Sequence, residues 1–476
     1  MRVLWTPDEI AAATGGRVDG TPSAVNGASI DTRTLQPGDL FFAVQGEARD
    51  GHDFVRAALE KGAGAAVVAE SRAADFAGVG PLVVVPDVLE AMGALGLAAR
   101  ARSRAGIVAV TGSVGKTGTK EALKAVLSRH GATHASVASY NNHWGVPLTL
   151  ARMPRESAYG VFEIGMNHPY EILPLTGMVR PHVALITTVE PVHIEFFRTL
   201  WGIADAKGEI FSGIEPGGTA VVNRDNPTFE RMRAHAQASR AGRILTFGEH
   251  ESADVRAERI VLKPDHSMVE ARVLGRPVVF RLGTPGRHIA MNALGILAVV
   301  QALGLDLSDA AQALAEIKPP VGRGERTMLA LKGGEALLID ESYNANPASM
   351  KAALTTLGGL DLGGRGRRIA VIGDMKELGE QGPDLHRGVA EAVEGNGVDL
   401  VFAAGGLMKN LVDALPAGRV AAHAPSSAEL VDAVASALQP GDAVMIKGSL
   451  STGMGLIVKA LKERFGSGAP QQAMKG

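Results

Sequence analysis

The feature that most constrains this chain is a strand that turns through glycines into a helix, at residues 106–127. Residues 106–110 are a short apolar run typical of a buried strand, and residues 120–127 carry apolar side chains at helical spacing. Further apolar runs at 159–164, 183–189 and 219–222 alternate with helical segments. This alternation predicts an α/β fold with a mostly parallel sheet and crossover helices.

The loop inside this unit has the chemistry of a phosphate site. A glycine loop before a helix directs backbone N–H groups and the positive end of the helix dipole at phosphate oxygens. Lys116 is placed to reach the terminal phosphates, and the Thr117 hydroxyl is placed to bind Mg²⁺. Val110 stands where the strict P-loop pattern needs glycine, so the loop has the tighter form TGxxGKT, and a chance Gly-Lys-Thr turn is the alternative. Because strand, glycines and helix are all present, we expect nucleoside triphosphate binding through Thr111, Gly112, Ser113, Val114, Gly115, Lys116 and Thr117.

Length and composition limit the remaining possibilities. A chain of 476 residues is too long for one hydrophobic core. The net charge of −2 does not favour nucleic acid as a partner. The absence of cysteine excludes disulfides and thiolate metal sites. The chain has no uninterrupted apolar run of membrane-spanning length and no signal-peptide pattern at its start, so we expect a cytoplasmic protein without membrane insertion.

The pattern of elements predicts three domains. Residues 1–105 form a small α/β unit with strands at 39–44, 65–69 and 82–85 and a helix over 88–104. Residues 106–322 form the central unit, with hairpins over 243–282, a long apolar helix over 286–303 and a linker at 318–324. Residues 323–476 form a third, Rossmann-like α/β unit with strands at 336–339, 368–372, 399–403 and 443–446. The tail from residue 466 is expected to be disordered.

Polar residues follow several predicted strands of the central unit. Glu163 ends one strand, where it would suit Mg²⁺ together with Thr117, although a solvated carboxylate is equally consistent. His193 and Glu195 follow the next strand, and a purely structural histidine is the alternative there. Lys207 lies on a predicted helix, where position alone favours a surface lysine.

The third unit has its own polar strand ends. Asp340, Tyr343 and Asn344 precede Asn346 and Pro347, a pair that also signals the start of a helix. Segments 373–379 and 447–449 likewise follow strands. Three polar strand ends on one sheet predict a crevice that binds a ligand.

Taken together, these segments resemble the Mur ligases of peptidoglycan synthesis over nearly the whole chain. The matching segments are 31–33 with 37–41 and 50–52, 111–117, 140–142 with 145–150, 163–167, 193–195, 206–211, 286–288 with 292–293, 340–347 and 373–379. Ser-Tyr-Asn-Ala-Asn-Pro at 342–347 and Gly-Asp-Met-x-Glu-Leu-Gly at 373–379 resemble the branch of the family that adds a dipeptide.

The resemblance implies an ADP-forming amide ligase. It would use ATP to phosphorylate the terminal carboxylate of UDP-N-acetylmuramoyl-tripeptide, and D-alanyl-D-alanine would then attack the acyl phosphate. The implied order of domains is UDP-sugar, ATP and incoming amine, in a monomer with two Mg²⁺ ions. Physically, the transferred phosphoryl group must be positioned and its charge neutralised.

The resemblance also implies roles for single residues. The catalytic residues would be Lys116, His193 and a carbamylated Lys207. The metal ligands would be Thr117, Glu163, His193 and Lys207. Asn292 would contact the adenine, and Arg323 and Asp340 the nucleotide. Substrates would contact Ser29, Asp31, Arg33, Asn142, Tyr343, Asn344, Asn346 and Lys447, the last near the reacting carboxylate.

Three positions depart from the family pattern. Gly118 stands where Thr or Ser is usual, His143 and Trp144 replace a smaller or acidic pair, and Leu450 stands where many members have arginine. None of these changes removes a phosphate or metal group.

Two other functions remain open at this point. One is another ligase of the superfamily, either the Mur ligase that adds the third peptide residue or folylpolyglutamate synthase. The segment 343–347 argues against both. The other is a GTPase-type switch, which would need an Asn-Lys-x-Asp segment after a strand, and the sequence has none. The third residue of the peptide would be meso-diaminopimelate or lysine.

Overall fold

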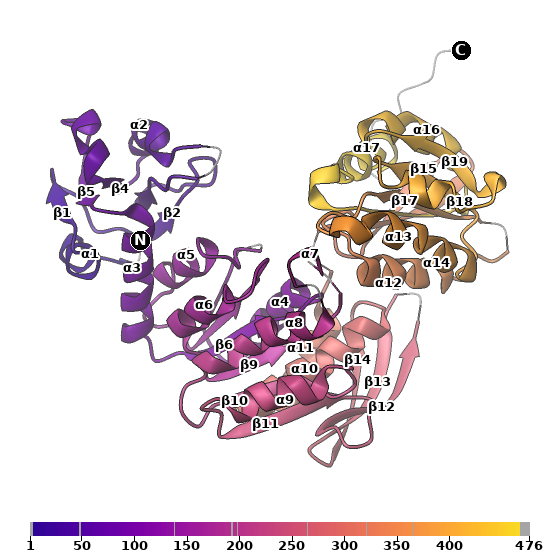
Figure 1. The fold of residues 1–476 in the computed structure, drawn as a ribbon, viewed down its shortest axis with the longest axis horizontal. Helices are drawn as coiled ribbons and strands as arrows, with labels where there is room; N and C mark the ends of the chain where they lie inside the picture. The colour runs from indigo at the N-terminus through magenta and orange to yellow at the C-terminus, as the bar shows by residue number, and fades with distance from the viewer. Residues whose placement is uncertain are drawn as a thin grey trace.

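The chain folds around three separate β-sheets, and a computed structural model gives their arrangement (Figure 1). The structure describes residues 3–46, 49–137, 139–191, 194–197, 199–263, 265–319, 321–364 and 366–466, with only the backbone described at Ile194 and Glu195. Two lobes flank a central one, and in Figure 1 they rise on either side of it. The mixed α/β class, with three mostly parallel sheets, confirms the fold class predicted from the sequence.

The N-terminal lobe is a five-stranded sheet of order β1-β5-β4-β3-β2, in which only β1 is antiparallel to its neighbour. Apolar clusters lie on both faces of this sheet. One of these clusters includes Leu148 and Ala151 of the next lobe, so the two lobes share a core. The elements are α1 (Pro7–Thr14), β1 (Arg17–Asp19), β2 (Gly27–Ser29), β3 (Asp39–Phe42), α2 (Val55–Glu60), β4 (Ala65–Ala69), β5 (Leu82–Val85) and α3 (Val88–Arg102).

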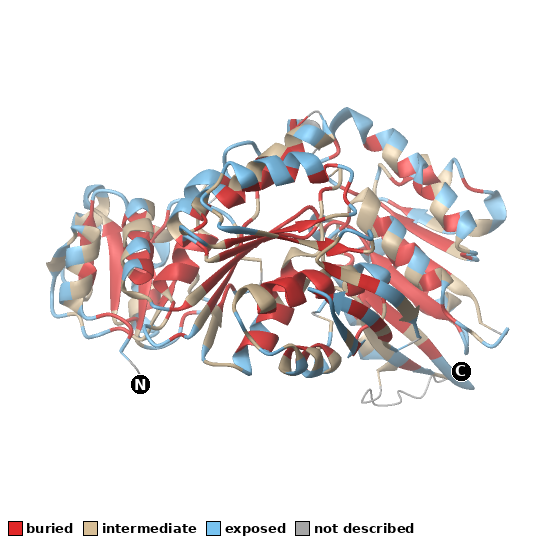
Figure 2. Cartoon of the chain, turned by 90° about the horizontal axis from the view of Figure 1, so that it is seen from below, coloured by how far each residue is buried: buried red, intermediate tan, exposed pale blue. Residues whose placement is uncertain are grey.

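The central lobe is a nine-stranded sheet of order β14-β13-β12-β11-β10-β9-β6-β8-β7. The strands at the centre of the sheet, from β8 to β10, are buried between helices on both faces, as Figure 2 shows by the red strands within the layers. The elements are β6 (Gly106–Thr111), α4 (Lys116–Ser128), β7 (Thr133–Ala135), α5 (Gly145–Ala151), β8 (Tyr159–Glu163), α6 (Ile172–Val179), β9 (Val183–Ile186), α7 (Ile194–Phe197), α8 (Leu200–Gly208), β10 (Thr219–Asn223), α9 (Phe229–Gln237), β11 (Arg243–Gly248), β12 (Val255–Leu262), β13 (Ser267–Val273), β14 (Arg276–Leu282), α10 (Arg287–Ala302) and α11 (Leu307–Glu316).

The hairpins predicted over 243–282 are correct for only part of that range. β12, β13 and β14 form an antiparallel meander at the sheet edge, with alternating burial along β13. β11, however, pairs in parallel with both β10 and β12. β11 is therefore part of the parallel sheet, and the hairpins begin only with β12.

The C-terminal lobe is a six-stranded sheet of order β15-β16-β20-β17-β18-β19, parallel except for β15. The elements are β15 (Glu325–Leu331), β16 (Gly334–Glu341), α12 (Pro347–Gly358), β17 (Arg368–Gly373), α13 (Gly382–Arg387), α14 (Val389–Gly395), β18 (Leu400–Ala404), α15 (Lys409–Val412), β19 (Val420–Ala424), α16 (Val431–Ala437), β20 (Ala443–Lys447) and α17 (Gly455–Phe465). β15 and β19, both at the sheet edges, were not predicted from the sequence. The tail from residue 467 lies outside the described residues.

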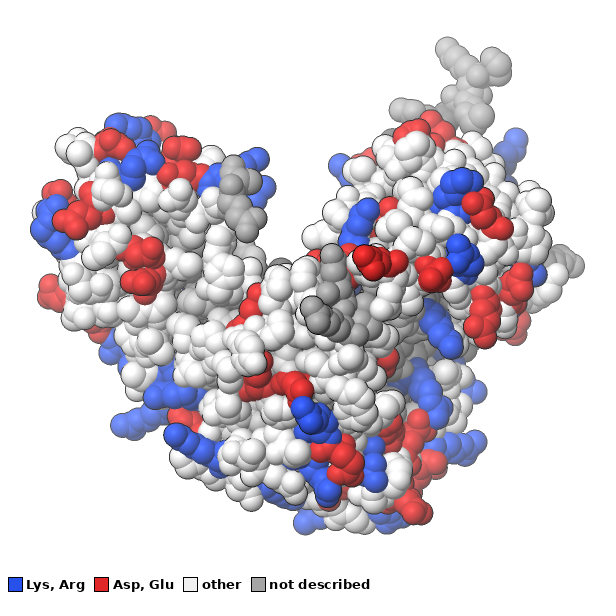
Figure 3. All heavy atoms as spheres, in the orientation of Figure 1, with Lys and Arg blue, Asp and Glu red and all other residues white. Residues whose placement is uncertain are grey.

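None of the helices in the described part of the chain combines the length and the apolar character needed to cross a membrane. Figure 3 shows mixed positive and negative side chains on the visible face, and a notch between the outer lobes.

Candidate active site

The predicted phosphate loop joins β6 to α4 at the carboxyl edge of the central sheet. Gly112 and Gly115 have φ angles of 152° and 85°, which favour glycine. A Cβ at Gly115 would lie 2.6 Å from Asn292 Nδ2, and one at Gly112 would lie 1.9 Å from Thr187 Oγ1. Both glycines are therefore required by the backbone path and by close packing, which explains the shifted glycine spacing seen in the sequence.

The loop is held from its neighbouring strand end. Thr188 O accepts from Ser113 N at 2.8 Å, and Glu190 O accepts from Ser113 Oγ at 2.9 Å. Thr187 Oγ1 donates to Val114 O at 2.6 Å. The Lys116 ammonium folds back to Gly112 O at 2.7 Å, inside the curve of the loop. These hydrogen bonds hold the loop in place around the Lys116 ammonium.

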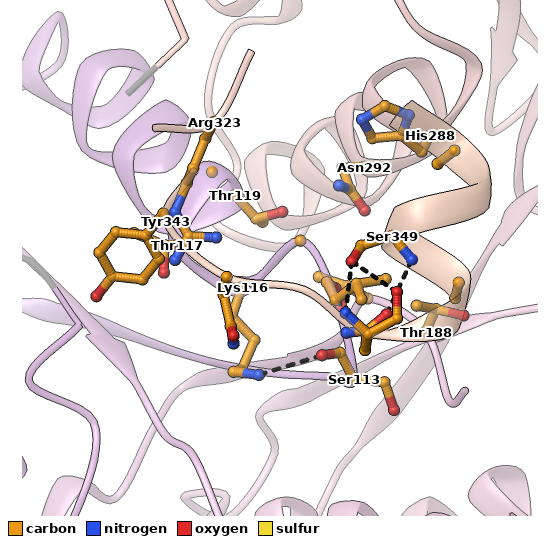
Figure 4. Close-up of a pocket in the computed structure, with 18 of the residues that line it drawn as sticks. Ser113, Lys116, Thr117, Thr119, Thr188, His288, Asn292, Arg323, Tyr343 and Ser349 are labelled. Carbon is orange, nitrogen blue, oxygen red and sulfur yellow. Dashed lines mark hydrogen bonds between the residues drawn. The ribbon is translucent and has the colours of Figure 1, made fainter. Parts of the chain in front are cut away.

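A cavity of about 930 Å³ opens onto this loop. It is lined from the central lobe by the loop, Asn141, Glu163 and α10, and from the C-terminal lobe by the residues after β16, β17 and β20. Figure 4 shows Arg323 and Tyr343 beside Lys116 and Thr117, with Asn292 and His288 on α10 across the pocket. The crevice predicted at the third unit's strand ends and the phosphate loop are thus one site.

Glu163 has the properties of a metal ligand in this cavity. Its side chain is 1% exposed, and Oε1 accepts from Asn141 Nδ2 at 2.7 Å. Its other oxygen, Oε2, is buried without a hydrogen-bond partner among the described residues. A buried carboxylate oxygen without a donor is costly unless a cation compensates it. The donor set of Glu163 with the Thr117 hydroxyl is one of hard oxygens, which suits Mg²⁺.

Lys207 is buried beside this cavity, behind Met166, and lies neither on the cavity wall nor on the protein surface. On α8, it is 2% exposed, and its Nζ lies 3.8 Å from Met166 Sδ. Among the described residues no carboxylate pairs with it. Burial, reinforced by the positive charge of Lys116, lowers the pKa of Lys207 well below its usual value. A lowered pKa favours the neutral, nucleophilic form of the amine.

The basic residues around the loop differ in their surroundings. Burial and Arg323 lower the pKa of Lys116, and the charge of Glu163 opposes this. The Arg323 guanidinium stacks over the Tyr343 ring at 4.1 Å. Lys447 is 3% exposed and donates to Asn344 O at 2.9 Å, with Glu341 Oε2 at 3.5 Å. Burial lowers the pKa of Lys447 as well.

Several predicted site residues lie elsewhere. Asp340 was expected to face the nucleotide, but it points to a smaller cavity of about 410 Å³, where its Oδ1 accepts from Ser342 N and Oγ. Strand alternation instead turns the adjacent Glu341 into the large cavity. Asn142 Oδ1 accepts from Gly145 N at 3.0 Å, in the turn before α5, and Asn142 does not line the large cavity, whereas Asn141 does. Asn346, by contrast, does line the large cavity, and it is also the N-cap of α12, where its Oδ1 accepts from Ser349 N.

The predicted UDP-sugar residues lie together in the N-terminal lobe, away from the large cavity. Ser29 Oγ donates to Asp31 O at 3.1 Å, and Asp31 binds the Arg33 guanidinium through both carboxylate oxygens. The Arg33 side chain is 82% exposed. His193 lies outside the described residues. The described residues contain no group of three or more His, Cys, Asp or Glu side chains arranged for a metal.

Comparison with known proteins covers the whole of this architecture. The Mur ligase middle domain matches residues 110–300, the glutamate ligase domain matches 322–450, and the Mur ligase family catalytic domain matches 24–101. The Escherichia coli UDP-N-acetylmuramoyl-tripeptide–D-alanyl-D-alanine ligase is 34% identical, over 96% of this chain and 98% of its own. The chain belongs to the Mur ligase family. The resemblance seen in the sequence is confirmed, and the protein is an enzyme of the ligase class.

Other relatives of this Mur ligase agree. The Synechocystis ligase of the same name is 36% identical over 92% of each chain. The crystal structure of MurF from Acinetobacter baumannii superposes with a TM-score of 0.84, at 29% identity over 96% of this chain and 99% of that one. MurF from Thermotoga maritima in complex with ADP has the same fold, with a TM-score of 0.74 and 24% identity over 92% and 97% of the two chains.

Proposed function

We propose that this Mur ligase joins D-alanyl-D-alanine to UDP-N-acetylmuramoyl-tripeptide, with ATP converted to ADP and phosphate. The relatives from Escherichia coli and Synechocystis carry this activity in their names, and each matches almost the full chain. The observation that carries the proposal is the shared cavity. Its walls combine a phosphate loop with the polar ends of three C-terminal strands, so a nucleotide and an amine acceptor would meet there.

The reaction would proceed through an acyl phosphate. A carboxylate oxygen of the tripeptide attacks the γ-phosphorus, the bond to the β-phosphate oxygen breaks, and ADP leaves. The neutral amine of the dipeptide then attacks the acyl carbon, the C–O bond to phosphate breaks, and the nitrogen loses a proton as the amide forms. Lys116 and the loop N–H groups hold the transferred phosphoryl group, and Lys447 lies at the acceptor side.

Magnesium would neutralise the phosphate charge at Thr117 and Glu163. The unpaired, buried Oε2 of Glu163 supports this assignment. Lys207 would attack CO₂ through its neutral amine and lose a proton, which forms a carbamate whose two oxygens share one negative charge. The burial of Lys207 without a described carboxylate partner supports this role. The carbamate and His193 would hold a second ion.

Other contacts follow from position in the fold. Asn292, packed on Gly115, would contact the nucleotide and its adenine, and Arg323 would contact the phosphates beside Lys116. Tyr343, Asn344 and Asn346 would line the dipeptide side. Asp340 has less support as a nucleotide contact, because it lies in the smaller cavity. The UDP-sugar would bind in the N-terminal lobe at Ser29, Asp31 and Arg33, with Asn142.

This division gives each lobe one ligand: UDP-sugar for 1–105, ATP for 106–322 and dipeptide for 323–476. We place the enzyme in the cytoplasm, where ATP and UDP-linked sugars are found. It would act as a monomer, since one chain builds the whole large cavity.

A substrate panel tests the assignment within the family. The purified protein is given ATP and UDP-N-acetylmuramoyl-tripeptide with D-alanyl-D-alanine, or the dipeptide precursor with meso-diaminopimelate or lysine, and products are identified by mass. Formation of the pentapeptide alone is expected. Addition of a single amino acid to the shorter precursor would assign the chain to another branch of the family.

A further inference from the structure

The C-terminal wall of the cavity carries two lysines at the ends of neighbouring strands. Lys447 ends β20, and Lys376 follows β17, which pairs with β20 at Ile372 and Lys447. Lys447 is 3% exposed, and its ammonium is already held by Asn344 O and Glu341. The Lys376 side chain is 47% exposed and lines the cavity. Of these two cations, Lys376 is the one accessible to a ligand.

The base of Lys376 is fixed by the buried Asp374. The Asp374 carboxylate accepts from Met408 N at 3.0 Å through Oδ1 and from Lys376 Nζ at 3.0 Å through Oδ2. The backbone N–H of Lys376 donates to Ser449 Oγ at 2.9 Å. The next residue, Glu377, has a φ of 63°, a strained conformation for a side chain other than glycine. A buried counterion and a strained turn thus place this lysine at the cavity edge.

The described residues supply one acceptor to the Lys376 ammonium, which has three N–H donors. Apolar side chains also line the cavity from the C-terminal lobe. Leu450 is 66% exposed at this wall, and Ala348 and Ala352 of α12 line it as well. A cavity wall that carries both methyl-bearing side chains and a cation suits a ligand that ends in a methyl group and a carboxylate.

Two other cations of the cavity lie on its phosphate side. Lys116 lies inside the phosphate loop, and Arg323 stacks on Tyr343 close enough to Lys116 to lower its pKa. These two cations serve the phosphate side of the cavity. Lys318, on the linker before the C-terminal lobe, also lines the cavity, and Lys376 is the exposed lysine at the strand ends of the C-terminal lobe.

We propose that Lys376 binds the terminal carboxylate of the incoming D-alanyl-D-alanine and selects the free dipeptide over forms without that charge. This assignment rests on the proposed function. An ammonium held by one carboxylate and open to a second forms a charge-assisted hydrogen bond to the ligand. Asp374 then acts as a positioning residue, which orients the lysine without touching the dipeptide.

The test compares D-alanyl-D-alanine with D-alanyl-D-alaninamide as acceptors, by ADP release in the presence of ATP and UDP-N-acetylmuramoyl-tripeptide. The native enzyme is expected to favour the dipeptide by about tenfold or more in kcat/KM. K376M is expected to raise KM for the dipeptide about tenfold or more, to leave the amide unchanged and to leave KM for ATP unchanged. K376R should retain the preference. K409M is the matched control, because Lys409 forms a surface pair with Asp413 away from the cavity.

Each other outcome overturns the assignment. If K376M weakens dipeptide and amide by the same factor, Lys376 serves only as the counterion of Asp374. If the native enzyme does not distinguish the dipeptide from its amide, no residue reads the carboxylate, and this result does not depend on whether K376M folds. If the native enzyme shows no turnover that depends on the dipeptide, the proposed function itself fails.

Discussion

The Tyr343 hydroxyl of the C-terminal lobe donates a hydrogen bond of 2.9 Å to Ser139 Oγ of the central lobe. Ser139 Oγ in turn lies 3.2 Å from Thr117 Oγ1 at the start of α4. Three hydroxyls from distant segments therefore connect the third lobe to the proposed metal ligand. Ser139 was not predicted from the sequence, because a lone serine after a short strand carries no recognisable pattern.

Removing the Tyr343 hydroxyl should weaken this connection without unfolding the protein. In Y343F the ring still stacks on Arg323, so we expect a loss of about 1 kcal/mol, or about fivefold in kcat/KM. S139A should give a similar loss, and the double variant little more than either alone, because both remove the same contact. Steady-state kinetics measure these values. Fully additive losses would mean that the two hydroxyls act independently.

Glu163→Gln should impair Mg²⁺ binding while the side chain keeps its shape and its bond from Asn141. Loss of the charge is expected to lower kcat/KM by more than about 100-fold. This is more than the loss typical of a residue that hydrogen-bonds to a metal ligand without touching the metal. When activity is titrated with Mg²⁺, the variant should need a higher Mg²⁺ concentration to reach half of its maximal activity. E230Q, a change on the surface of α9, is the control. An unchanged Mg²⁺ titration in E163Q would remove Glu163 from the metal site.

Lys207→Ala should lose activity by about 100-fold or more, and short-chain carboxylates such as acetate should partly restore it by supplying the missing oxygens. The protein should still fold, because the change removes an amine whose charged form is disfavoured by burial. K207M provides the matched control: it fills the space, so acetate should not rescue it. Full activity of K207A without additives would exclude the carbamate.

His134 should make the central lobe sensitive to acid. Its Nε2 lies 2.8 Å from Thr149 O, and burial lowers its pKa from 6.5 to about 4. Because the folded form resists protonation, its contribution to stability is full above pH 6.5 and is lost as the pH falls toward 4. The loss would reach about 3 kcal/mol. Denaturant unfolding at pH 7 and pH 4.5 measures it, and H134Q should be less sensitive to pH. An identical pH dependence in H134Q would assign the acid sensitivity to other groups.

The sequence predicted the parts of the site that local patterns encode. The phosphate loop depends on glycines next to a strand and a helix, and these lie within a few residues of each other. Glu163 was found because parallel strands bring ligand groups to their carboxyl ends. The edge strands β15 and β19 were missed because edge strands are half exposed, and their side chains lack a continuous apolar run.

Other features depend on packing between distant segments. Lys207 follows no pattern of its own that separates it from a surface lysine, and its burial comes from neighbours such as Met166. The choice between Asp340 and Glu341, or between Asn141 and Asn142, depends on which way one residue points at the end of an element. A shift of one position along a strand exchanges its two faces. The sequence alone does not determine which of two adjacent residues faces the cavity at the end of an element.

The most direct test of the proposed activity is ADP release by the purified protein with ATP, Mg²⁺ and UDP-N-acetylmuramoyl-tripeptide, measured with and without D-alanyl-D-alanine. We predict that sustained ADP release requires the dipeptide and matches pentapeptide formed one for one. ADP release that is indifferent to the dipeptide would contradict the proposed ligase activity.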